Sequence, residues 1–187
     1  KNLSVGFNLS YMFGNITVGS NVVYPDSLYY ANLKVENYVT MSDLYLDFGL
    51  QYYGKMGREK NLEFVAGAIF APTMKMKSKA DYLARTFFLS TSNIEYIKDT
   101  VAMGTDYEGD IVIPMMAGVG FSLGKPDRWL AGFDAKWQNW EKYTAFGMGD
   151  SLGNSLRISA GSEIIPDINN YNRYFQRVRY RVGFMYQ

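Results

Sequence analysis

The chain has 187 residues and a formal net charge of +1, with 20% charged and 17% aromatic residues. This near-neutral charge provides no field for a polyanion, so we expect no nucleic-acid partner. The chain contains no Cys and no His, which excludes disulfides, thiolate metal sites and Ser-His catalysis within it. We therefore expect no enzyme, no metal site and no cofactor.

The first predicted strand covers Asn2 to Gly14, "NLSVGFNLSYMFG". Its odd positions, from Leu3 to Phe13, are apolar, and its even positions are mostly small and polar. Strict alternation of this kind is typical of a β-strand with two different faces. An ordinary strand has about 5–6 residues, whereas a tilted strand needs about 9–11 to cross a bilayer. The length therefore favours a membrane strand.

Six later segments repeat this alternation, which brings the number of long predicted strands to roughly seven. No helical periodicity of useful length competes with them. The six segments are Leu44–Tyr52, Asn61–Pro72, Asp110–Gly124, Arg128–Trp140, Ser155–Ile164 and Arg177–Tyr186.

The predicted connections alternate in length. Three are short, polar and rich in turn residues, and the other three are longer. Short turns on one side and long loops on the other are typical of outer-membrane barrels. The longest connection contains "RTFFLSTSNIEYI", residues 85–97, which we expect to form an extra hairpin. The short turns are Gly54–Lys60, Gly124–Arg128 and Pro166–Tyr174; the long loops are Asn15–Asn37, Lys77–Gly109 and Lys142–Gly153.

Two classes of all-β protein fit this pattern, and the sequence favours the membrane class. The alternative is a soluble β-sandwich or lipocalin-like barrel with the apolar residues inside. Soluble sheets rarely keep seven strands of this length, and the aromatic residues lie near the strand ends, where the girdles of membrane barrels form. No apolar run is long enough for a membrane helix. We predict an antiparallel transmembrane β-barrel, integral to the bacterial outer membrane, as a single domain over residues 1–187.

The last third of the chain resembles the FadL-like outer-membrane transport family in its Bacteroidetes branch. The resemblance rests on an Ile-x-x-Pro strand, a Trp-x-x-Gly-x-Asp strand, an Arg-x-Ser-x-Gly strand and a Tyr-Arg-x-Gly strand. The first third, including "SVGFNLSYMFGNI" and "LYLDFGLQYYGK", is also similar to that branch. The motifs fall at Ile111–Pro114, Trp129–Asp134, Arg157–Gly161 and Tyr180–Gly183.

This resemblance implies a 14-stranded barrel with a hatch in its lumen. Seven strands are about half of such a barrel, and the first residue is Lys1 rather than Met. We therefore expect a fragment that lacks the hatch and some strands. The implied function is passive uptake of long-chain fatty acids or other hydrophobic molecules. The alternative is a non-transporting barrel that serves as a scaffold or partner in an outer-membrane secretion or assembly complex. The expected partners are outer-membrane lipid, a fatty acid or similar ligand, and other outer-membrane proteins.

Charged residues of the last three predicted strands fall on the face opposite the apolar one, which is the predicted lumen. They form either a polar track for a ligand carboxylate or an ion-pair ladder that neutralises buried charge. We favour the ladder, because unpaired buried charge is costly. The residues of this predicted luminal network are Asp134, Lys136, Arg157, Glu163, Arg177, Arg179 and Arg181.

Three smaller features carry weaker predictions. Asp106, Glu108 and Asp110 resemble a Ca²⁺ loop but lack its further ligands, so we favour a solvated acidic loop. The "KMKSK" stretch, residues 75–79, suits lipopolysaccharide phosphates or, as we prefer, a solvated rim. Pro114 within a predicted strand indicates a kink or bulge, which could open a lateral gap.

Overall fold

The computed structural model describes residues 2–24, 30–57, 61–90, 92 and 94–187. These residues form one antiparallel sheet of eleven strands with two short helical segments, so the all-β antiparallel class is confirmed. No helix in these ranges is long and apolar enough to span a membrane. The elements are β1 (Leu3–Val22), β2 (Asn32–Met56), β3 (Leu62–Ala71), β4 (Met74–Leu89), β5 (Glu95–Ile113), β6 (Met116–Lys125), β7 (Trp129–Gln138), η1 (Trp140–Lys142), β8 (Thr144–Ala145), β9 (Met148–Gly149), β10 (Ser155–Ile164), α1 (Tyr174–Arg177) and β11 (Tyr180–Tyr186).

The long strands follow one another across the sheet in chain order. β2 pairs with β1 on one side, and with β3 and then β4 on the other. β3 and β4 continue one another, as do β5 and β6, because β3 pairs with β6 and β4 with β5. β7, β10 and β11 complete the meander. Counted in this way, the sheet has the seven long strands that the sequence predicts.

Two predicted loops are wrong, because strands occupy most of them. In the predicted loop Lys77–Gly109, residues 77–89 lie in β4 and residues 95–109 lie in β5. The hairpin predicted at residues 85–97 is partly right, because β4 and β5 are connected there. The Ser90 backbone N–H donates a hydrogen bond to the Ile94 carbonyl oxygen at 2.9 Å. The predicted loop Asn15–Asn37 is likewise taken up by β1 as far as Val22 and by β2 from Asn32.

Prolines interrupt two of the long strands at neighbouring points. Pro72 separates β3 from β4, and Pro114 separates β5 from β6. Ala71 pairs with Met116 before the break and Met74 with Ile113 after it, so the two interruptions lie side by side. A proline has no backbone N–H for the ladder, which explains a break rather than a continuous strand. The kink predicted at Pro114 is confirmed, and the continuous strand predicted over Asp110–Gly124 is wrong.

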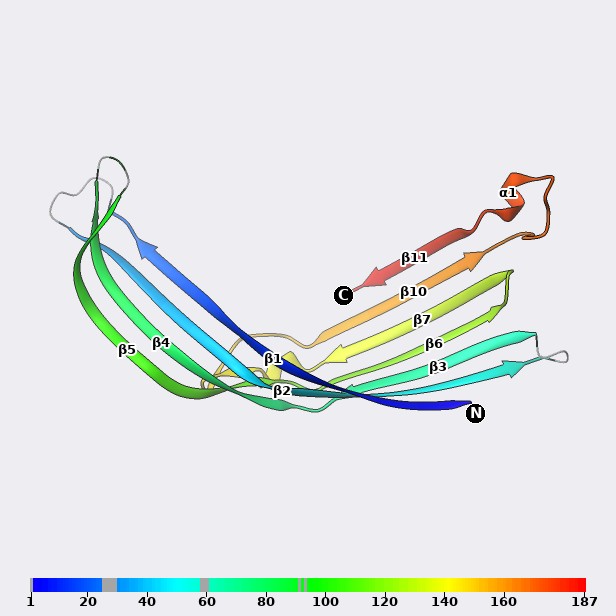
Figure 1. Cartoon of the computed structure of the whole chain (residues 1–187), viewed down its shortest axis with the longest axis horizontal. Coiled ribbons are helices and arrows are strands. Elements are labelled where there is room, and N and C mark those ends of the chain that lie inside the picture. Colours follow the sequence, from blue (N-terminus) through cyan, green and yellow to red (C-terminus); the bar gives the residue numbers. More distant parts are fainter. Residues whose placement is uncertain (1, 25–29, 58–60, 91, 93) are drawn as a thin grey trace.

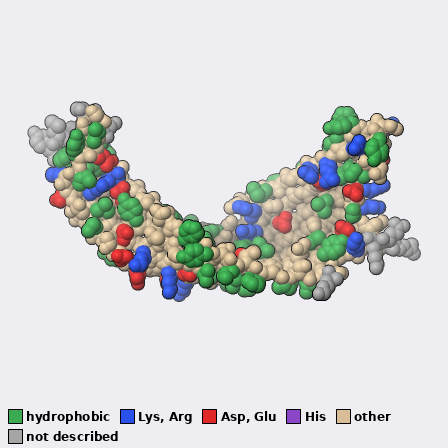
Figure 2. Space-filling model, in the orientation of Figure 1, with side chains coloured by type: hydrophobic (Ala, Val, Ile, Leu, Met, Phe, Trp, Pro, Cys, Tyr) green, Lys and Arg blue, Asp and Glu red, His purple; other side chains and the backbone are tan. Residues whose placement is uncertain are grey.

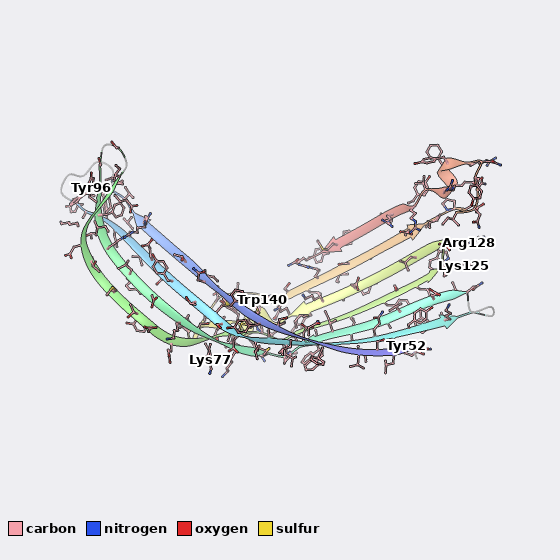
Figure 3. All side chains as sticks on the ribbon, viewed as in Figure 1. Tyr52, Lys77, Tyr96, Lys125, Arg128 and Trp140 are labelled. Atoms are coloured by element: carbon pink, nitrogen blue, oxygen red, sulfur yellow. The ribbon has the colours of Figure 1, made fainter. Side chains whose placement is uncertain are left out.

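These interruptions divide the sheet into two parts, which meet at a bend (Figure 1). The first part, which we call the band, contains β3, β6, β7, β10 and β11 together with Leu3–Phe13 of β1 and Leu44–Met56 of β2. The second part, the extension, contains Asn15–Val22 of β1, Asn32–Met41 of β2, and β4 and β5. Figure 3 places Lys125 and Arg128 at the turn end of the band and Tyr96 at the tip of the extension.

The band has one apolar face that is continuous across its strands. Its side chains lie opposite one another in the ladders, as in Phe7 with Phe48, Phe48 with Phe70, and Phe121 with Phe133. Most of these side chains are exposed, and only six hydrophobic residues besides Pro114 are buried in the described part of the chain. Hydrophobic side chains accordingly lie over the surface of the sheet in Figure 2. The core is thin because one sheet has no second layer against it.

The sheet is open in the described part of the chain. β1 pairs with β2 alone, and β11 pairs with β10 alone. Closure of the sheet into a barrel therefore stays a prediction.

Candidate functional site

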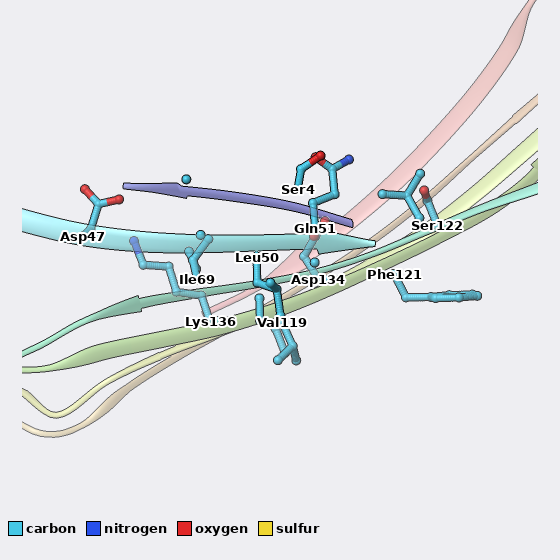
Figure 4. Close-up of a pocket in the computed structure, with 18 of the residues that line it drawn as sticks. Ser4, Asp47, Leu50, Gln51, Ile69, Val119, Phe121, Ser122, Asp134 and Lys136 are labelled. Carbon is cyan, nitrogen blue, oxygen red and sulfur yellow. The ribbon is translucent and has the colours of Figure 1, made fainter. Parts of the chain in front are cut away.

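The polar face of the band forms a long trough whose floor is rich in glycine. Glycines lie opposite one another at Gly6 with Gly49, Gly67 with Gly120, and Gly132 with Gly161. Without side chains at these points, the trough encloses about 750 Å³. Figure 4 shows Ser4, Gln51 and Asp47 on this face, whereas Leu50, Val119 and Phe121 point away from it. The predicted division into a polar and an apolar face is therefore present.

Three residues of the predicted luminal network line this trough. Asp134 and Lys136 lie two positions apart on β7, and Arg157 lies opposite Lys136 on β10. The Asp134 carboxylate lies over Gly120, where a Cβ atom would come within 2.3 Å of Oδ1. Arg157 donates from Nε and Nη2 to the Gln187 amide oxygen at 3.0 and 2.7 Å. Within the described ranges, neither Asp134 nor Lys136 has an ion pair within 4.0 Å.

Three further residues of the network form a compact ion-pair cluster at the turn end of the band. Glu163 lies opposite Arg181 in the ladder, and the two side chains approach to 2.5 Å. Arg179 reaches the other carboxylate oxygen of Glu163 at 3.3 Å. The Glu163 side chain is 19% exposed, so two cations surround a carboxylate that is partly shielded from water. At this end of the band the predicted ion-pair ladder is present.

Arg177 was assigned wrongly to this network. It is the last residue of α1, and β11 begins only at Tyr180. Its guanidinium lies over the Tyr171 ring at 5.1 Å, a cation–π contact within the connection. The alternation of Arg177, Arg179 and Arg181 resembled a strand, but the chain turns between the first two of them.

The extension holds an ion-pair network that the sequence analysis missed. Glu36 on β2 lies 3.7 Å from Lys34 and 3.4 Å from Arg85 on β4. Glu95 on β5 lies 3.4 Å from Lys34 and 4.0 Å from Arg85. The network thus joins three strands. The alternating charges of Lys34 and Glu36 were a usable signal, but they fell within a predicted loop.

The acidic stretch of β5 is paired with a lysine. Lys79 on β4 lies 3.1 Å from Asp106 and 3.7 Å from Glu108. The hydrogen bond to Asp106 is the main cause that raises the pKa of Lys79 above its usual value. The predicted acidic loop is therefore wrong in structure, because these residues lie in a strand. No group of three or more acidic residues in the described ranges has the geometry of a metal site.

One carboxylate lies where the extension joins the band. Asp43 accepts hydrogen bonds from the backbone N–H groups of Lys77 at 3.0 Å and Leu44 at 2.8 Å. The carboxylate thereby ties β2 to β4 beside the proline interruption.

Comparison with known proteins gives one family. The model of the BamG family matches residues 1–187, whereas no curated protein and no solved structure matches the chain. The resemblance to the FadL-like transport family is therefore wrong, because the family model that matches the whole chain is that of BamG. BamG proteins are outer-membrane components associated with the BAM assembly complex. The family match therefore supports the expected association with the outer membrane and with other outer-membrane proteins, and it does not support fatty-acid transport. The chain belongs to the BamG family.

Proposed function

We propose that this chain is a membrane-embedded, non-transporting subunit of the outer-membrane assembly complex. The family match supports the association with the complex. The observation that carries the membrane part is the apolar face of the band, which runs in register across all seven long strands. Lys125, at the turn end, is the one charged residue on that face among the residues described.

The dimensions of the band suit a bilayer. β3, β6, β7 and β10 each have 10 residues. At about 3.3 Å per residue, such a strand is about 33 Å long, and a tilt of about 35–45° reduces its height to about 25 Å. That height equals the apolar band of outer-membrane proteins. A soluble sheet would need a second layer to cover the same face.

Aromatic residues lie at both ends of the apolar face. Trp129 and Tyr180 lie near the turn end, and Trp137 and Tyr186 lie toward the opposite end. Tyr and Trp side chains favour the membrane–water interface, where the ring is shielded and its polar atom stays hydrated. Their positions support a band of membrane thickness.

The trough supports a structural role better than a transport role. Arg157 in its lining is held by Gln187, Asp47 accepts a hydrogen bond from Asn8, and Glu163 beside the trough pairs with two arginines. Paired groups of this kind stabilise the wall of a polar interior. The trough is lined by glycine, serine and charged residues together with apolar side chains such as Val65 and Ile69, so the structural role rests on the held charges rather than on the lining as a whole.

Purification of the full-length protein from native membranes tests this proposal. We expect a tagged protein to remain in the membrane after an alkaline wash. In mild detergent it should co-purify with BAM proteins in a fixed ratio, and its depletion should slow the appearance of folded outer-membrane proteins. An untagged strain is the control for non-specific capture. A lone protein in mild detergent, together with unchanged membrane-protein assembly after depletion, would contradict the proposal.

A further inference from the structure

The two faces of β1 and β2 exchange their chemical character halfway along the strands. In β1, the odd positions are apolar from Leu3 to Phe13 and polar from Asn15 to Asn21. The even positions change in the opposite sense: they are small or polar from Ser4 to Ser10, and they include the aliphatic Ile16 and Val18 farther along the strand. The exchange occurs without a slip, because the β1–β2 ladder is continuous from Leu3 to Val22. The geometric face is thus the same, and only its chemistry inverts.

The partner strand changes at the same level. On the same face as Phe13, β2 is apolar from Leu44 onward and polar or charged before it, from Lys34 to Ser42. Phe13, the last apolar residue of β1 on this face, lies opposite Ser42, which is the last polar residue of β2 before Leu44. The change in chemistry therefore occurs at the level of this pair. In addition, Asp43 is bonded to Lys77 at this level, just beyond the Pro72 interruption. β1 and β2 therefore change their chemistry at the level where β3 gives way to β4 and β6 to β5.

The remaining strands of the band end near this boundary. β7 ends at Gln138, which lies opposite Met116 at the start of β6 and opposite Ser155 at the start of β10. Among the described strands, β1, β2, β4 and β5 alone continue beyond it, with the short β8–β9 hairpin paired to β5. β4 alone has 16 residues, which is about 50 Å at about 3.3 Å per residue.

The outer face of the extension is the face of Asn15, Thr17, Lys34 and Glu36 in β1 and β2, and its chemistry is incompatible with lipid. It carries the network of Lys34, Glu36 and Arg85, and also the Lys79–Glu108 pair. A charged residue facing the middle of a bilayer costs about 2–4 kcal/mol. Several such residues on one face would prevent that face from being embedded.

We infer that the lipid acyl chains cover the apolar face of the band only, and that the boundary of the membrane lies between Phe13 and Thr17. Beyond it, the four-stranded extension stands in water. This inference rests on the proposed membrane-embedded role, which it deepens by assigning the lipid-contacting surface and its limit. The occupant of the apolar face is lipid rather than a protein layer, because the strand length matches the bilayer and the face is free of charge between its ends.

Single-cysteine labelling of the full-length protein in native outer-membrane vesicles tests the boundary. The chain contains no Cys, so each substitution introduces one thiol into this chain. The variants Phe7→Cys and Thr17→Cys lie on the same face of β1, one on each side of the boundary. Only the thiolate reacts with a membrane-impermeant maleimide, and an apolar environment suppresses it, so we expect Thr17→Cys to react at least about tenfold faster.

A spin label on the same thiols identifies what covers each site. We expect the label at Phe7 to be accessible to oxygen and shielded from a water-soluble nickel complex, and the label at Thr17 to behave oppositely. Equal maleimide rates at the two positions would overturn the boundary. A label at Phe7 that neither oxygen nor nickel reaches would show a protein layer there and overturn the lipid assignment. If a variant fails to fold, Leu9→Cys and Gly19→Cys repeat the comparison on the same face. Co-purification with BAM proteins is a separate measurement, so either result can fail without the other.

Discussion

An arginine at the centre of the apolar face gives the sharpest test of where the membrane lies. Phe7 is midway between Leu3 and Phe13, and its side chain is 72% exposed, so few contacts within the sheet are lost when it is replaced. Phe7→Arg should therefore cost mainly the transfer of a charge into lipid, about 2–4 kcal/mol at the bilayer midplane. An exposed substitution in a soluble sheet would change the free energy of unfolding by only about 0.5 kcal/mol.

Thr17→Arg is the matched control, because it introduces the same charge on the same face of the same strand. Its cost should be close to zero if the extension stands in water. The assay is urea unfolding of the protein folded into lipid vesicles, followed by the fluorescence of its 3 Trp residues. The reasoning would be refuted by equal losses for the two variants.

Three further predictions concern stability. Gly124→Ala should destabilise the band by about 1–3 kcal/mol in urea unfolding, because its Cβ would lie 2.6 Å from the Trp129 carbonyl, whereas Gly132→Ala, with a nearest contact of 3.7 Å, should be tolerated. Glu163→Gln should cost no more than about 1 kcal/mol, since both arginines are more than half exposed, and the difference from wild type should shrink in high salt. Asp43→Ala should destabilise the fold in urea unfolding by about the net contribution of one hydrogen bond, because the backbone N–H groups of Lys77 and Leu44 lose the carboxylate that accepts their hydrogen bonds.

The sequence predicts the band well because one physical rule governs it throughout. Most strands there alternate between apolar and polar or small residues with a period of two, and the band portions of all seven long strands were found from that period. The face of each residue follows from the same period, and Asp134, Lys136 and Arg157 lie together on one surface. Individual contacts, such as Arg157 with Gln187, depend on side-chain positions that the period does not encode.

The extension was missed because its alternation runs in the opposite phase and is weaker. Residues such as Asn15 and Thr17 looked like the start of a loop after an apolar strand, although Ile16 and Val18 between them keep the period of two. In β4 and β5, register shifts occur between Ala80 and Tyr82 and at two later points, and these interrupt the period. A search that allowed the phase to invert would have found the strands.

The direction of the strands limits how this sheet can take part in a larger one. Seven long strands that alternate in direction leave β1 and β11 running the same way. If these two edges met, they would form a parallel pair in an otherwise antiparallel sheet. A fully antiparallel barrel has an even number of strands, so one that includes this sheet takes an odd number of further strands between β11 and β1. The edge of β1 is suited to such a neighbour, because its 20 residues contain no charged residue and no proline to block pairing.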